Sequence, residues 1–296
     1  MPTHPPLFSQ RARRRTDIVK TTTRAAINSS SQHVFDVLRT VGDAAEPPGV
    51  SDIGRLLGLT GSTVFRALTT LEASGYVSRF RNLPQFELGT MPYLLNRALL
   101  NRFEINLASR PFLRELALQT GETVSLNVRL GWYSLRLSGV YGSRDIYHRD
   151  RLGELGLLHH ALPGRAILAC LTETDLAEMG RFLTDIAHEW PGEEAWAGLR
   201  VIVREAKTIG FLAEALPMSP GFCAIGMPVR DHSGTAIASI TITGPVYPSE
   251  NIPALLAVRD RLETLIAADP ERFVSPFAHL PPERICLKVP RSKTIP

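Results

Sequence analysis

The sequence predicts an α+β protein in which a small helical domain with a β-hairpin precedes a larger mixed α/β domain. Three observations lead to this fold class. The chain has 296 residues, a length typical of about two domains. Residues 50–88 combine helical periodicity with a short hairpin pattern, and residues 111–268 alternate between strand and helix patterns. With 44% hydrophobic and 21% charged residues, both domains can bury a core.

Two short helices separated by a tight turn are expected early in the chain. Ser51 is a candidate N-cap for a helix that ends at Gly58, since glycine tolerates the left-handed conformation at a helix end. After the turn, Thr60 or Ser62 can cap a second helix that stops at Gly75. The apolar positions that recur at helical spacing are Ile53, Leu56 and Leu57, then Val64, Ala67, Leu68 and Leu71.

The second helix keeps a polar face outside this apolar stripe. Arginine is the residue that most often contacts guanine in the major groove, and hydroxyls reach base edges or phosphates. We therefore expect this helix to contact DNA, although a helix-turn-helix unit can also be only a packed structural motif. The residues outside the stripe are Ser62, Thr63, Phe65, Arg66, Thr69 and Thr70.

An upstream helix and a downstream hairpin complete the small domain. Apolar residues from Val34 to Val41 supply the third helix, and residues 76–80 and 85–88 alternate like two short strands. The hairpin carries Arg79, Arg81 and Asn82, which can reach phosphate or the minor groove. Residues 25–90 thus predict a winged helix-turn-helix with Ser51, Ser62, Thr63, Arg66, Thr70, Arg79 and Arg81 as candidate DNA contacts.

A basic arm precedes this domain. Residues 1–30 hold six basic residues and only Asp17 as an acid, whereas the whole chain carries a net charge of +4. Residues 1–24 are interpreted as a flexible arm that contacts phosphate by counterion release, or as a solubilising tail. The basic residues are Arg11, Arg13, Arg14, Arg15, Lys20 and Arg24.

Cysteine spacing and hydropathy argue against several classes of protein. Cys170, Cys223 and Cys286 are odd in number and widely spaced, which fits neither a disulfide framework nor a metal site. The chain shows no apolar run of membrane-helix length and no signal-peptide pattern. We expect a cytoplasmic protein without a membrane partner, cofactor or metal, and without catalytic residues, because the common nucleophile, nucleotide and zinc motifs are absent.

The remaining chain divides into three parts. Residues 91–108 are apolar with few helix breakers and predict a linker helix whose apolar excess suggests dimer packing. Residues 109–270 predict the α/β domain, with a hairpin around residues 231–234 and a last long helix over 252–268. Residues 271–296 are rich in proline and are interpreted as a tail.

Six short segments of this sequence form a recognisable series in their order and spacing. They lie at residues 62–68, 75–77, 86–89, 116–123, 161–169 and 225–234. Together they resemble the isocitrate lyase regulator (IclR) family of bacterial transcription factors over about residues 30–268. The resemblance implies a winged helix-turn-helix, a linker helix and a GAF- or PAS-like effector-binding domain in a dimer or tetramer that senses a metabolite.

The sequence departs from the family pattern at four places. Gly61 stands where relatives usually carry Lys before the recognition helix. Leu162 and Pro163 replace the expected glycine or serine, and Arg165 replaces a frequent Lys. Ala224 stands where many relatives carry Cys, with Cys223 adjacent. These changes concern the identity of the effector more than the fold.

Strand alternation supplies a candidate effector site. Between residues 236 and 243, Ser239, Thr241 and Thr243 share one face, which either faces water or binds a carboxylate. The resemblance favours the second interpretation and adds Glu214 to the cavity. His159 and His160 either donate to an anionic ligand or are structural. The candidate effector residues are His159, His160, Glu214, Cys223, Ala224, Ser239, Thr241 and Thr243.

The expected function is transcription regulation of catabolic or metabolic genes through double-stranded DNA, with a roughly palindromic operator, under control of a small organic or aromatic acid. Two alternatives stay open from the sequence. One is a sensor-like domain that acts as an enzyme or ligand carrier. The other is a DNA-binding protein that needs no effector.

Overall fold

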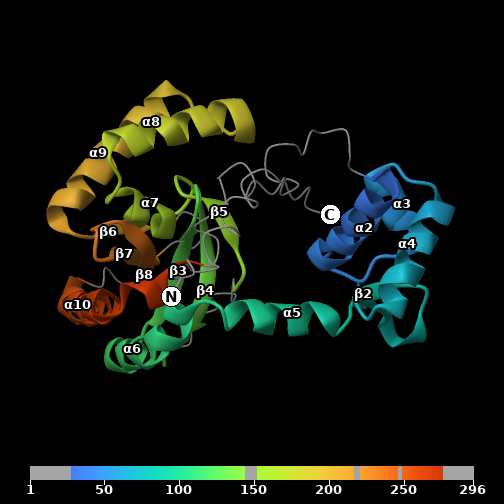
Figure 1. The fold of residues 1–296 in the computed structure, drawn as a ribbon, viewed down its shortest axis with the longest axis horizontal. Helices are drawn as coiled ribbons and strands as arrows, with labels where there is room; N and C mark the ends of the chain where they lie inside the picture. Colours follow the sequence, from blue (N-terminus) through green and yellow to red (C-terminus); the bar gives the residue numbers. More distant parts are fainter. Residues whose placement is uncertain (1–27, 144–151, 217–220, 246–248, 276–296) are drawn as a thin grey trace, which may run out of the picture. The chain divides into compact units, whose positions relative to one another are not determined.

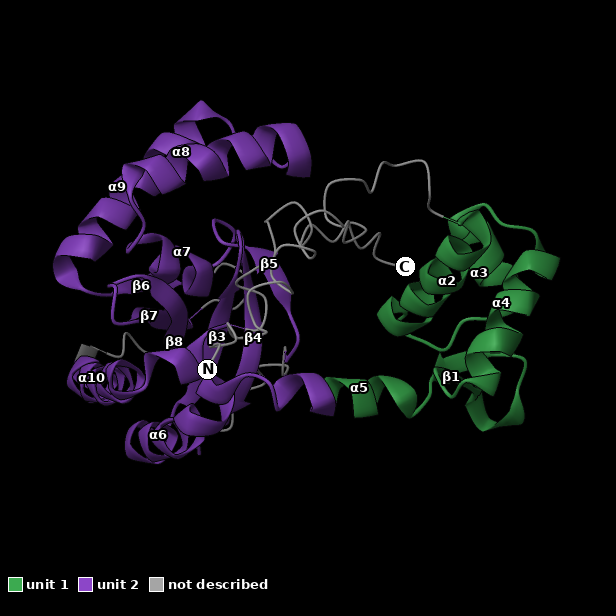
Figure 2. Cartoon of the chain, in the orientation of Figure 1, with its two compact units in different colours: residues 1–96, 290–296 green, residues 97–289 purple. Residues whose placement is uncertain are grey.

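The computed structural model describes residues 28–143, 152–216, 221–245 and 249–275 (Figure 1). The proposed basic arm and most of the proposed tail lie outside these residues. The chain divides into two compact units, residues 1–96 with 290–296 and residues 97–289, which are described separately below (Figure 2). The α+β fold class with an N-terminal helix-turn-helix and a C-terminal α/β domain is confirmed.

The first unit is a three-helix bundle with a small hairpin. Thr60 is the N-cap of α4, and its hydroxyl accepts the Thr63 N–H. The predicted apolar stripe of α4 is buried in the core. The expectation that Ser51 caps the preceding helix is wrong. Gly49 is the N-cap, and its N–H donates to the Asp52 carboxylate at 3.1 Å. The helices are α2 (Ser29–Asp43), α3 (Val50–Leu57) and α4 (Gly61–Ala73).

The hairpin forms the predicted wing. β1 (Val77–Arg79) pairs antiparallel with β2 (Phe86–Leu88), and the side chains of Val77 and Phe86 complete the core of the unit. Between the strands, Arg81 and Asn82 adopt positive φ angles of 48° and 63°. Both residues therefore occupy left-handed backbone conformations that glycine adopts more easily.

The single helix expected over residues 91–108 is wrong in the structure, which has two helices there. α5 (Met91–Leu100) ends in a short turn, and α6 (Glu104–Thr120) begins after Phe103. The break occurs because Phe103 adopts extended backbone angles and buries its ring, 2% exposed, in the core of the second unit.

The second unit is built on a six-stranded antiparallel sheet. Its strand order is β5-β4-β3-β8-β7-β6, so the hairpin strands β7 and β8 lie inside the sheet, with β8 beside β3 and β7 beside β6. Gly234 turns this hairpin with φ +82°, as predicted. The short edge strand β5 was not foreseen. The strands are β3 (Thr123–Leu130), β4 (Tyr133–Val140), β5 (Leu155–Leu157), β6 (Leu212–Ala215), β7 (Cys223–Arg230) and β8 (Ala236–Gly244).

Helices cover both faces of this sheet (Figure 1). α6 and α10 pack on one face, where Ile240 and Ile242 of β8 are fully buried among apolar side chains. α7 packs on the opposite face, and α8 and α9 lie on the same side (Figure 1). These helices are α7 (Leu162–Leu168), α8 (Glu173–Phe182), α9 (Glu193–Ile209) and α10 (Ile252–Ala268).

Two glycines let α7 approach its neighbours closely. A Cβ on Gly164 would lie 2.3 Å from the Leu158 carbonyl oxygen. A Cβ on Gly226 would lie 2.4 Å from a methyl carbon of Leu162 in α7. Cβ atoms do not come so near to other atoms. The position of α7 over β7 therefore depends on glycine, which has no Cβ, at residues 164 and 226.

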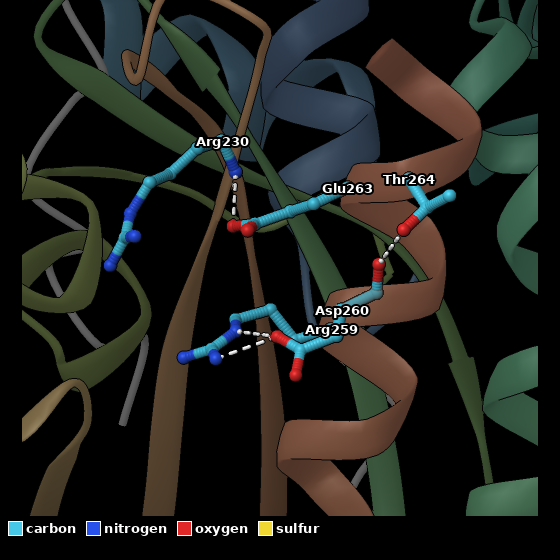
Figure 3. A network of polar contacts seen from close by, with 5 residues as sticks. All are labelled: Arg230, Arg259, Asp260, Glu263 and Thr264. Carbon is cyan, nitrogen blue, oxygen red and sulfur yellow. Dashed lines mark hydrogen bonds and ion pairs between the residues drawn. The ribbon is translucent and has the colours of Figure 1, made fainter. Parts of the chain in front are cut away.

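On the other face, polar contacts join α10 to the end of β7 (Figure 3). The backbone N–H of Arg230 donates to the Glu263 carboxylate at 2.9 Å, while the Arg230 guanidinium extends away from this bond (Figure 3). After α10, Phe273 buries its ring in the core, so the expected tail is wrong for its first residues, which include the short helix η6 (Pro270–Phe273).

Candidate functional site

The first candidate site is the exposed face of α4. Its four apolar residues are buried beneath, which leaves Arg66 and Thr70 exposed and Thr63 half-buried. The Thr70 hydroxyl donates to the Arg66 carbonyl at 3.0 Å, so it can accept but has already used its proton. The guanidinium of Arg66 is thus the strongest hydrogen-bond donor that this face offers to a ligand.

Two further cations lie on the wing. Arg79 forms an ion pair with Glu72 of α4 at 3.2 Å and lies over the ring of Phe86. Arg81 lies over the ring of Phe80 at the wing tip. Ser51 and Ser62 are exposed near the starts of α3 and α4. The structure therefore places all seven predicted DNA contacts in the first unit, on α3, α4 and the wing.

The second candidate site is a cavity of about 500 Å³ in the second unit. It lies on the α7 side of the sheet, bounded by strands β3 to β8 and by the first turn of α7. A volume of this size is typical of small-molecule sites. Charged and polar residues that line it are Asn127, Ser134, Arg136, Glu154, His160, Arg165, Glu214, Thr241 and Thr243.

The predicted hydroxyl face of β8 does not face water. Thr241 is only 2% exposed, and its hydroxyl lies 2.6 Å from that of Ser125 on β3. The Asn127 amide donates to Ser125 at 3.4 Å, which extends this chain of polar groups across the sheet. Buried polar groups of this kind are costly unless each has a partner, so a ligand here must match them.

An ion pair forms one wall of the cavity. The Arg165 guanidinium in α7 donates to Oε2 of Glu214 in β6 at 2.6 Å, with side chains 24% and 21% exposed. Burial raises the pKa of the Glu214 carboxyl, while the attraction and hydrogen bond of Arg165 lower it. Nε of Arg165 and Oε1 of Glu214 are buried and have no partner among the described residues.

The predicted effector residues are brought together only in part. Those that line the cavity are His160, Glu214, Ala224, Thr241 and Thr243. Ser239 lies on the same face of β8 but donates to the Pro163 carbonyl at 2.8 Å, which holds α7 on the sheet. Cys223 and Ala224 are neighbours in a strand, so their side chains point to opposite faces, and Cys223 does not line the cavity.

His159 also lies outside the cavity lining. Its ring contacts the ring of His160, with centroids 4.2 Å apart. Burial, together with the nearby charges of His160 and Arg165, lowers the pKa of His159 to about 4. His159 is therefore neutral at physiological pH, which makes it a poor partner for an anion.

Sequence reasoning missed five polar residues of the cavity wall, which are Asn127, Ser134, Arg136, Glu154 and Arg165. Asn127, Ser134 and Arg136 lie on β3 and β4, far along the chain from the proposed strand. Arg165 had been singled out as a departure from the family pattern but was not placed in the site. A usable pattern did exist, because Asn127 and Ser125 share a face of β3 by strand alternation.

Other site classes find no support in the described part of the chain. No cluster of three or more His, Cys, Asp or Glu residues there could hold a metal ion. Cys170 and Cys223 are free thiols. No helix among the described residues has the length and apolar character needed to cross a bilayer.

A winged helix-turn-helix joined to an α/β unit with a polar cavity defines a class, the DNA-binding transcriptional regulators. Two family models identify the particular family. The model described as "IclR helix-turn-helix domain" matches residues 30–79, and that described as "Bacterial transcriptional regulator IclR C-terminal" matches residues 97–252. The chain belongs to the IclR family.

Relatives agree with this assignment and are named as regulators, not enzymes. The HTH-type transcriptional regulator XynR of Escherichia coli K12 is 22% identical over 220 residues, covering 73% of this chain and 86% of XynR. The HTH-type transcriptional repressor AllR of the same strain is 25% identical over 215 residues, covering 71% of this chain and 77% of AllR.

Solved structures share the fold. An IclR homologue from Microbacterium hydrocarbonoxydans, described as complexed with 4-hydroxybenzoate, superposes with a TM-score of 0.65 and 21% identity. The match covers 79% of this chain and 98% of that one. At this identity the likeness establishes the fold alone.

Proposed function

We propose that this regulator binds a small organic or aromatic acid in the cavity beside α7 and thereby controls catabolic or metabolic genes. One observation carries the proposal. The cavity holds about 500 Å³ and combines apolar wall residues with the guanidinium of Arg165 and the hydroxyls of Thr241 and Thr243. Such a lining suits a carboxylate on a compact carbon skeleton.

The relative with 4-hydroxybenzoate supports this ligand class, since that molecule is an aromatic acid. In our proposal the cavity residues His160, Glu214, Ala224, Thr241 and Thr243 contact the effector. Ser239 and His159 act indirectly, because Ser239 fixes α7 and His159 packs beside His160.

For DNA, we propose that α4 enters the major groove and that the wing reaches the backbone or minor groove. Arg66 is the base-reading side chain in this arrangement, while Ser51, Ser62 and Thr63 contact phosphates or base edges. Thr70 lies on the same face but contributes little, because its hydroxyl already donates to the Arg66 carbonyl. Arg79 and Arg81 supply positive charge from the wing.

Two copies of the chain bind together in this proposal, as a homodimer or within a tetramer. The observation in support is the exposed apolar surface of α5, where Tyr93, Leu94 and Leu95 are 70%, 49% and 51% exposed. Exposed apolar patches of this kind are typical of interaction surfaces. A two-fold dimer would read a roughly palindromic operator in the cytoplasm.

The effector controls DNA binding only if it prefers one arrangement of the DNA-binding units. Such coupling is typically about 1–3 kcal/mol and acts equally in both directions. A ligand that binds tightly but shifts no equilibrium is not the effector.

The test is fluorescence anisotropy of the full chain on the DNA upstream of its own gene and on a scrambled fragment, over a salt series. Site-specific binding tighter by about a thousandfold, and changed by 4-hydroxybenzoate or a related acid, supports the proposal. Specific binding that no organic acid alters favours a regulator without an effector. Equal weak binding to both fragments contradicts site recognition at this operator.

A further inference from the structure

Arg165 and Glu214 both line the cavity, and each has one buried polar atom without a hydrogen-bond partner among the described residues. One oxygen of Glu214 accepts from Arg165 at 2.6 Å, while Oε1 is buried without a partner. Nε of Arg165 is also buried without a partner. Thus one polar atom there needs a donor and the other needs an acceptor.

A monocarboxylate with no hydrogen-bond donor of its own can pair with Arg165 but not with Glu214. Its oxygens accept from Arg165, but it has no proton to give to Oε1 of Glu214. Two carboxylates then share one guanidinium in a partly buried place, and like charges at short range repel strongly. An unpaired buried acceptor adds a further cost.

The charges of the cavity wall also disfavour binding of an anion by charge alone. Two arginines, Arg136 and Arg165, are balanced by two acids, Glu154 and Glu214. Nearby His160 has its pKa lowered by burial and so adds little positive charge. The wall therefore offers no excess of positive charge to hold an anion by charge alone.

We propose, on the basis of the proposed function, that the effector is a small acid with a hydroxyl or amino group on the carbon next to its carboxylate. A small rotation of the two side chains turns these buried atoms toward the cavity, where the carboxylate accepts from Arg165 and the adjacent O–H or N–H donates to Oε1 of Glu214. Both unsatisfied atoms are then paired by one compact group. The ion pair is thereby a selectivity filter against acids that lack the donor.

The test compares three acids of nearly equal size in isothermal titration calorimetry on the full chain. Mandelate carries the α-hydroxyl, phenylacetate lacks it, and α-methoxyphenylacetate keeps the oxygen but not the proton. We expect mandelate to bind at least roughly tenfold more tightly than either of the others, since sites built for a hydroxyl reject analogues without it.

The variant Glu214→Leu removes the acceptor and frees Arg165. It should erase the preference for mandelate and bind phenylacetate at least as tightly as the parent protein does. Glu173→Leu is the matched control, because Glu173 forms an exposed ion pair with Arg200 on α8 and α9 and does not line the cavity. It should leave the preference unchanged.

The comparison of the three acids on the parent protein decides the matter even if Glu214→Leu does not fold. Equal binding of mandelate and phenylacetate overturns this inference and leaves the proposed function intact. Tight binding of α-methoxyphenylacetate overturns it as well. Failure of all three acids to bind overturns this inference, while the proposed function is overturned only if 4-hydroxybenzoate and related acids also leave DNA binding unchanged.

Discussion

The exposed face of α4 and the cavity beside α7 use the same residue types in opposite settings. On α4, Arg66 and Thr70 are exposed, so a partner displaces only water and each contact adds its own increment. In the cavity, Thr241 and Ser125 are 2% and 4% exposed, and every polar atom left unpaired costs free energy. An open surface thus tolerates mismatched partners, whereas a buried one rejects them.

The largest effect is expected from a substitution that disturbs the close packing of α7. Gly164→Ala places a Cβ against the Leu158 backbone, so α7 must shift, and we expect a loss of about 2–4 kcal/mol in the free energy of unfolding. Gly61→Ala in α4 is the comparison, because its Cβ would meet only a methyl of Val50 at 3.8 Å.

Tryptophan fluorescence during denaturation follows the affected unit, since all three tryptophans, Trp132, Trp190 and Trp196, lie in residues 97–289. The Gly164 variant should unfold at lower denaturant by this signal. Gly61 lies in the unit without tryptophan, so its variant is followed by circular dichroism and should keep the midpoint of the parent protein. Unchanged stability of Gly164→Ala would mean that α7 is free to move.

The next largest effect concerns DNA. Arg66→Ala should weaken specific binding by about 1–3 kcal/mol if the guanidinium reads a base. Anisotropy on the specific and scrambled fragments measures it. Arg181→Ala, on exposed α8 of the second unit, is the control. A loss of affinity that is equal on both fragments would show that Arg66 contacts phosphate and not a base.

A smaller effect involves pH and the second unit. The pKa of His159 is about 4 in the folded chain and about 6.5 when unfolded. The unfolded chain therefore takes up the proton first, so the stabilisation is complete above pH 6.5 and is lost as the pH falls toward 4. His159→Gln should reduce this acid-induced loss by about 1–2 kcal/mol, allowing for partial exposure.

Denaturation with tryptophan fluorescence at a series of pH values checks this prediction. His232→Gln, in the exposed hairpin turn, is the control and should keep the slope of the parent protein. An identical slope for His159→Gln would show that other groups cause the acid sensitivity.

The smallest effect is expected on the open surface. The Thr70 hydroxyl already donates to the Arg66 carbonyl, so it has no proton to give to a phosphate. Thr70→Val should therefore change DNA affinity by less than about 0.5 kcal/mol. A loss as large as that of Arg66→Ala, measured in the same anisotropy assay, would place Thr70 directly against a base.

Local patterns in the sequence predicted the first unit well. The stripe from Val64 to Leu71 and the turn at Gly58 depend only on neighbours within a few residues. The cap at Ser51 failed because Asp52 can bond back to Gly49, a competition that spacing alone does not resolve. The break before α6 was missed because Phe103 is drawn into a core formed by distant residues.

The cavity was less predictable because its walls come from separate strands. Alternation along β8 separated the hydroxyls from the apolar residues but did not show that α7 covers the hydroxyl face. Arg165 and Glu214 lie 49 residues apart in the chain, and only the fold brings them together. The same alternation rule, applied to β7, would have kept Cys223 out of the site.

The wing tip places two consecutive side chains where the backbone favours glycine. Each such residue costs on the order of 1 kcal/mol in backbone free energy. A redesign for thermal robustness would install glycine at Asn82 and gain stability while losing an amide at the point of the hairpin. At Arg81 and Asn82, protein engineering must therefore choose between a more stable domain and the polar side-chain contacts of the hairpin tip.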